Sequence, residues 1–138
     1  EFRARYEIHL EAYCKVVRIE ALTSIDMIRK QILPAGLSYT ADLCHGVNEK
    51  AAVGASCKAE KALIADLSAT TDGLYDACEK LSADLTGVPA SPEAAAKYYH
   101  DVITVDMAAA RKLADHLETL TEKSYWPFPT YYELLSSV

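Results

Sequence analysis

The feature that most constrains this chain is a run of mostly apolar residues that recur three or four positions apart. The run comprises Leu63, Leu67, Thr70, Leu74, Ala77, Leu81 and Leu85. Such spacing places every one of these side chains on the same side of a helix and is typical of a seam between packed helices. Gly73 lies inside the run and costs about 1 kcal/mol relative to alanine, yet the spacing stays in phase across it. We expect a helix over 57–86, in which a bend near Gly73 is favoured over a full break.

A second stretch with helical spacing covers about residues 2–52. Its apolar stripe includes Tyr6 and Tyr13, which we expect to help hold the core. Pro34 lacks a backbone donor, but helix-forming residues continue beyond it, so the sequence predicts a kink there rather than an end. After a glycine-containing turn, Ser56 is the expected N-cap of the next helix.

A third helical stretch is predicted over 92–123. Ser91 is its expected N-cap, and Pro92 suits the first helical position because its missing N–H needs no partner there. Three long helices with short connections indicate an all-α, elongated, antiparallel up-down-up bundle that forms a single domain over residues 1–138. At about 1.5 Å per residue, thirty residues span on the order of 45 Å, so we expect a rod. Leu63, Leu74 and Leu113 are the predicted structural anchors of its core.

The last segment, residues 124–138, differs from the rest because it is rich in aromatic residues and proline. Pro127 and Pro129 favour extended backbone at Trp126 and Phe128. Thr130 and Glu133 have the spacing of a capping box, which predicts a short terminal helix. Because aromatic side chains bury about 150–250 Å² each, we interpret Trp126, Phe128 and Tyr131 as anchors of an extended tail that docks on protein surface.

The composition disfavours several classes of partner and location. The net charge of −6 disfavours nucleic acid and anionic membranes as partners. No apolar run reaches the roughly 18–20 residues that span a bilayer, and no signal segment opens the chain, so a cytoplasmic location is expected. Four scattered cysteines favour reduced thiols over a disulfide framework. The chain begins at Glu1 within a helical pattern, from which we expect a segment of a longer protein.

We assign no catalytic, cofactor-binding or metal-ligating residue in this sequence. The histidines lack the spacing that brings two ligands onto one helix face, and no phosphate-binding loop or nucleophile motif occurs. Asp26 and Asp106 lie among apolar residues, where an ionised carboxylate needs a partner such as Arg29 or Arg111. These two carboxylates are therefore candidates for a cross-helix or cross-domain contact.

Three strings carry a resemblance to a known family. They are RYEIHLEAYCKVVRIEALTSIDMIRKQILPA (5–35), YYHDVITVDMAAARKLADHLETLTEK (98–123) and SYWPFPTYYELL (124–135). Together they resemble the C-terminal end of type III glutamine synthetases, in particular through EALTSIDM, ILPA and YWPFPTY. The string ITVDM (103–107) differs from the proline-containing form of the family, and Tyr132 stands where a glycine is usual.

The resemblance implies a C-terminal helical domain of an enzyme that ligates ammonia to glutamate with ATP and magnesium or manganese. In that family the ligands for metal, nucleotide and glutamate belong to upstream domains, so this segment alone is expected to be inactive. Its expected partners are the rest of its own chain and neighbouring subunits of a homo-oligomer. The alternative is a stand-alone helical adaptor that binds a partner helix or peptide between its own helices.

Overall fold

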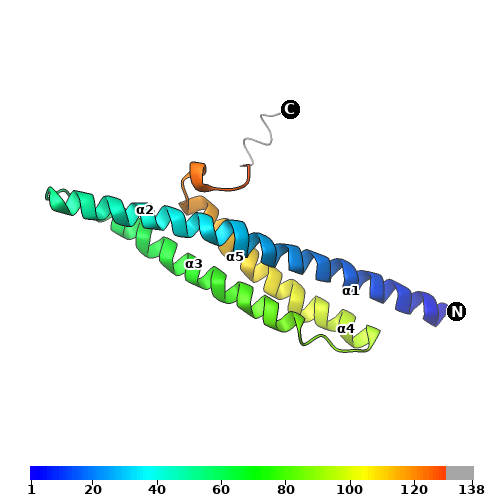
Figure 1. Ribbon diagram of the computed structural model, residues 1–138. Coiled ribbons are helices and arrows are strands. Elements are labelled where there is room, and N and C mark those ends of the chain that lie inside the picture. The colour runs from blue at the N-terminus through cyan, green and yellow to red at the C-terminus, as the bar shows by residue number, and fades with distance from the viewer. Residues whose placement is uncertain (130–138) are drawn as a thin grey trace.

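The computed structural model describes residues 1–129, which form long helices and contain no β-strand (Figure 1). The expectation of an all-helical fold is thereby confirmed. The first helical rod joins helix α1 (Phe2–Met27), a π-helical turn (Ile28–Ile32) and helix α2 (Leu33–Ala52). The rod continues through Pro34, which is the second residue of α2. A proline ring clashes with the carbonyl four residues earlier in a regular helix, and the wider π turn lies where that clash would occur.

The second and third rods follow after short connections. The second is helix α3 (Lys58–Leu85), which is unbroken at Gly73. The third joins helix α4 (Pro92–Tyr98), a second π turn (Tyr99–Ile103) and helix α5 (Thr104–Leu120), and a 3-10 turn over Lys123–Tyr125 comes after it. The sequence predicts neither π turn.

The turn between α2 and α3 is set by Gly54, whose φ of 71° lies in the left-handed region that favours glycine. The N–H of Gly54 donates to the carbonyl of Ala51 at 3.2 Å, and the N–H of Ala55 donates to the carbonyl of Lys50 at 2.9 Å. This pairing satisfies the last carbonyls of α2 in a Schellman arrangement. The prediction that Ser56 caps α3 is wrong, because α3 begins one residue later and Cys57 occupies the N-cap position without a side-chain cap.

The start of α4 confirms the second predicted cap. Ser91 has extended backbone, and its side chain accepts a hydrogen bond from the N–H of Ala94 at 3.3 Å. The end of α5 comes three residues earlier than predicted, at Leu120. Thr121 leaves the helix with extended backbone while its hydroxyl donates to the carbonyl of Leu117 at 2.7 Å.

The core lies where the rods run side by side. The chain reverses direction after α2 and again after α3, so that α3 packs against both α2 and α5 (Figure 1). The largest fully buried side chains of the core are Leu67, Leu74, Cys78, Leu81, Ile103 and Leu117. Each fully buried leucine contributes about 1.5–3 kcal/mol relative to an exposed one. Leu63 and Leu113 are half-buried and pack against this core.

The expectation that Tyr6 and Tyr13 hold the core is wrong. Tyr6 is 48% exposed and Tyr13 is 37% exposed. Figure 1 shows that the N-terminal end of α1 extends past α4 and past the α3–α4 connection. No residue of α1 before Val17 is buried.

Candidate interaction surfaces

The Asp106 carboxylate on α5 is buried, with only 7% of the residue exposed. The ammonium group of Lys80 on α3 donates to one oxygen of Asp106 at 3.1 Å and to Asp84 at 2.6 Å. The other oxygen of Asp106 is buried without a hydrogen-bond partner. Asp106 therefore makes a cross-helix contact, but its partner is Lys80 and not the expected Arg29 or Arg111.

Burial and the neighbouring charged groups shift the pKa values of this cluster. Desolvation, followed by the proximity of the Asp84 carboxylate, raises the pKa of the Asp106 carboxyl. The neighbouring Asp106 carboxyl and then the hydrogen bond from Lys80 lower the pKa of Asp84. The two carboxylates, Asp84 first, raise the pKa of Lys80 to about 12. The Tyr98 hydroxyl donates to the backbone carbonyl of Asp84 at 2.7 Å, so the cluster ties α3 to both α4 and α5.

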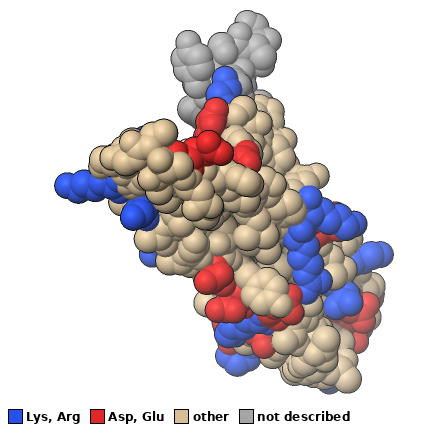
Figure 2. Space-filling view, turned by 60° about the vertical axis from the view of Figure 1, so that its left-hand side comes forward, with Lys and Arg blue, Asp and Glu red and all other residues tan. Residues whose placement is uncertain are grey.

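Asp26, the other carboxylate identified in the sequence, lies on the surface. It pairs with Lys30 of the next helical turn at 2.7 Å, and its side chain is 59% exposed. Arg29 instead reaches across to Glu79 of α3, where the two side chains pair at 3.0 Å. On the face shown in Figure 2, basic and acidic side chains lie beside one another with uncharged surface between them.

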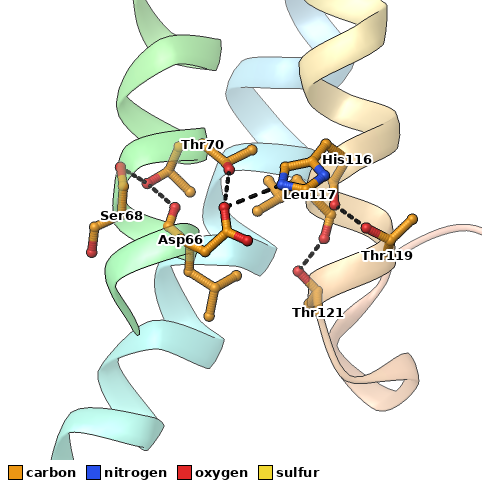
Figure 3. Close-up of polar contacts among 9 residues, drawn as sticks. Asp66, Ser68, Thr70, His116, Leu117, Thr119 and Thr121 are labelled. Carbon is orange, nitrogen blue, oxygen red and sulfur yellow. Dashed lines mark hydrogen bonds and ion pairs between the residues drawn. The ribbon is translucent and has the colours of Figure 1, made fainter. Parts of the chain in front are cut away.

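A second polar cluster links α3 and α5 on the side drawn in Figure 3. The Nε2 atom of His116 lies 3.1 Å from a carboxylate oxygen of Asp66, and the Thr70 hydroxyl donates to the same oxygen at 3.3 Å. Thr119 and Thr121 donate to backbone carbonyls of their own helix. One imidazole and one carboxylate do not make a metal site, and among residues 1–129 no three His, Cys, Asp or Glu side chains gather closely enough to form one.

The four cysteines form no disulfide bond within residues 1–129. All four are free, with Cys57 and Cys78 buried, Cys14 half-buried and Cys44 exposed. Burial raises the pKa of the Cys78 thiol, which keeps it protonated and unreactive. The Cys57 sulfur lies 3.7 Å from the carbonyls of Val47 and Ala55 and so helps close the α2–α3 turn.

An apolar groove of about 450 Å³ lies between the first rod and α5. Its lining includes Met27, Ile28, Met107, Arg111, Trp126 and Phe128. Trp126 and Phe128 meet edge to face with their ring centroids 6.5 Å apart, and both are half-buried against the core. Of the three predicted tail anchors, these two therefore contact the bundle, whereas Tyr131 lies outside the described residues, as does the terminal helix predicted after it.

The contact that holds the start of the tail was not predicted from the sequence. The Tyr125 hydroxyl donates to the Asp42 carboxylate of α2, and its ring packs on Tyr39 with the centroids 5.1 Å apart. The bond to Asp42 raises the pKa of Tyr125 to about 12. No local sequence pattern joins residues 83 positions apart. The bond fixes the 3-10 turn against the first rod, and Trp126 and Phe128 follow directly after it.

Helix α1 carries exposed apolar side chains that the bundle does not cover. Exposed apolar side chains follow this helix on two sides, from Phe2 at 86% exposed to Leu22 at 47% exposed. In a monomer, contiguous apolar patches of this kind are typical of interaction sites. None of the helices in residues 1–129 combines the length and the apolar composition needed to cross a bilayer.

Comparisons with known proteins agree with the resemblance found in the sequence. The family model for the glutamine synthetase C-terminal domain matches residues 1–51, the first rod. A glutamine synthetase of Butyrivibrio fibrisolvens is 34% identical over 142 aligned positions, which cover the whole chain and 20% of that relative. A type-3 glutamine synthetase of Dictyostelium discoideum is 27% identical, with 98% of the chain and 20% of the relative covered. The chain thus spans about one fifth of the length of the curated relatives it matches, and it belongs to the C-terminal domain family of the glutamine synthetases.

Proposed function

We propose that this chain is the structural C-terminal domain of a cytoplasmic glutamine synthetase and that it helps to assemble a homo-oligomer. In this account the three rods form an up-down-up bundle that packs on the catalytic domains of the same chain. The other domains of the enzyme ligate ammonia to glutamate with ATP and magnesium or manganese.

The main support for this proposal is that charged and polar side chains pair with one another across helices. Lys80 with Asp106, Arg29 with Glu79, and Asp66 with His116 all pair across helices, so their charges serve packing. The groove between the first rod and α5 is mostly apolar. A site for a nucleotide and divalent metals needs several converging oxygen ligands, and these residues do not fit that requirement. The match to the C-terminal fifth of two glutamine synthetases supports the same assignment.

The test compares two proteins under one assay with ATP, magnesium, glutamate and ammonium. We expect the full-length chain to form glutamine and the 138-residue segment alone to form none. Removing residues 1–138 from the full-length chain should also change the number of subunits in its oligomer, as measured by mass photometry. Glutamine formation by the isolated segment would contradict the proposal, and so would a full-length chain that forms no glutamine.

A further inference from the structure

The N-terminal part of α1 carries a surface that the bundle leaves uncovered. We define the projecting face as Ile8, Val16, Ile19 and Leu22, whose exposed fractions lie between 47% and 64%. Figure 1 shows that this end of α1 extends beyond the other helices. The exposed fractions show that the bundle itself does not cover this face.

The apolar residues of α1 are not confined to one side of the helix. Val17, Ala21 and Ile25 are buried in the core. Nine positions separate Ile8 from Val17, and at about 100° per residue these two side chains lie on opposite sides of the helix. A surface helix normally restricts its apolar residues to a single stripe, whereas a helix that is apolar on both sides is typical of a buried position. A second protein surface is the environment that such a helix requires.

The charges of α1 indicate what kind of partner fits. Residues 1–22 contain the basic residues Arg3, Arg5, Lys15 and Arg18 and the acidic residues Glu1, Glu7, Glu11 and Glu20. Because these charges balance, the segment has no net attraction for phosphate groups or for anionic lipid. Burial of the aliphatic and aromatic side chains is the available driving force, so the fitting partner is an apolar protein surface.

We infer that the projecting face is covered by the part of the same polypeptide that precedes Glu1. This inference rests on the proposed function and adds the surface through which the domain docks. The relatives are about five times longer than this chain and match it with their C-terminal part, so the rest of their chains precedes the position of Glu1. The projecting face begins within two helical turns of that junction. A covalently attached partner meets it at a high effective concentration, which a separate copy does not have.

The experiment measures thiol accessibility in the full-length protein. Ile19→Cys and, as a control, Val105→Cys are each made in a Cys44→Ser background, since Ile19 and Val105 are 56% and 59% exposed in the bundle and Cys44 is exposed. Maleimide labelling of each site is followed by mass spectrometry of its peptide, in native protein and in urea. We expect the thiol of Ile19→Cys to react at least about tenfold more slowly in native protein than in urea. In native protein the covered site must first open locally before maleimide can reach it. The Val105→Cys control should react at similar rates in both.

Two further readouts on the same samples separate the possible results. If Ile19→Cys labels freely while the enzyme forms glutamine, the docking surface is wrong and the proposed function stands. If Ile19→Cys is protected but no glutamine forms with ATP, magnesium, glutamate and ammonium, the proposed function is wrong and the docking surface stands. If the protection disappears on dilution to monomers, as followed by mass photometry, the occupant is a second copy and the inference is overturned.

Discussion

Replacing glycine by alanine should affect stability differently at two positions of helix α2. Gly36 is buried, and an added Cβ atom would lie 3.0 Å from Leu117 Cδ2 and 3.0 Å from Thr71 Cγ2. At Gly46, an added Cβ atom would meet nothing within 4 Å. Both glycines lie inside the helix, so alanine improves the helical propensity equally at the two positions and only the packing differs.

The magnitude follows from these two contributions. Alanine in place of glycine stabilises a helix interior by about 1 kcal/mol, and this is the whole effect expected for Gly46→Ala. For Gly36→Ala, overpacking costs about 1–3 kcal/mol. Neither neighbour moves easily, because Leu117 is fully buried and the Thr71 hydroxyl donates to the Leu67 carbonyl at 2.9 Å. The free energy of unfolding of Gly36→Ala should therefore lie about 1–3 kcal/mol below that of Gly46→Ala.

The assay is urea denaturation followed by the helical circular dichroism signal. Equal dependence of the unfolding free energy on urea in both variants would show that the comparison concerns the native state. If Gly36→Ala is as stable as Gly46→Ala, the close packing of α2 against α3 and α5 at Gly36 is refuted.

Three further predictions concern stability and use the same assay. Leu74→Ala should lower the free energy of unfolding by about 2–5 kcal/mol, since Leu74 is fully buried. Ser91→Ala should cost about 1 kcal/mol by removing the N-cap of α4, whereas Ser56→Ala should change stability by less than about 0.5 kcal/mol. Lys80→Met should destabilise the protein at neutral pH because it leaves the Asp106 carboxylate buried without a cation.

The last of these effects depends on pH. Burial holds the pKa of Asp106 above its ordinary value, so in the folded chain this carboxyl gains its proton at a higher pH than in the unfolded chain. The destabilisation by Lys80→Met should be complete above this raised pKa and should shrink as the pH falls through it. A destabilisation that is constant from neutral to acid pH would show that Lys80 acts through its alkyl chain alone.

The other two predictions have their own contradicting outcomes. If Leu74→Ala lowers the free energy of unfolding by less than about 1 kcal/mol, Leu74 is not a core residue. Equal effects of the two serine substitutions would contradict the capping assignment.

Local signals in the sequence were sufficient to place the helices. The seam through Gly73 stayed in phase, and α3 is continuous there because a neighbouring side chain, Leu113, fills the space beside the glycine. Ser91 followed by Pro92 marked the start of α4 correctly. Ser56 looked equally suitable as a cap, but the residues that close the preceding turn moved the start of α3 by one position.

Features that depend on where the rods lie relative to one another were not predictable in this way. The stripe through Tyr6 and Tyr13 has helical spacing, yet both rings are exposed, because spacing alone does not determine whether a neighbouring helix covers a side chain. The pairing of Lys80 with Asp106 likewise depends on the register between α3 and α5. The two π turns each add a residue to a helical turn, and periodicity alone does not report such a local change.

The most direct measurement of the central claim is a structure of the full-length enzyme with bound nucleotide and metal, determined by cryo-electron microscopy. We predict that Ile8, Ile19 and Leu22 are buried against preceding domains of the same chain, and that nucleotide and metal are held by residues outside these 138. A nucleotide or metal ligand supplied by this domain, or a projecting face that remains in solvent, would contradict the account.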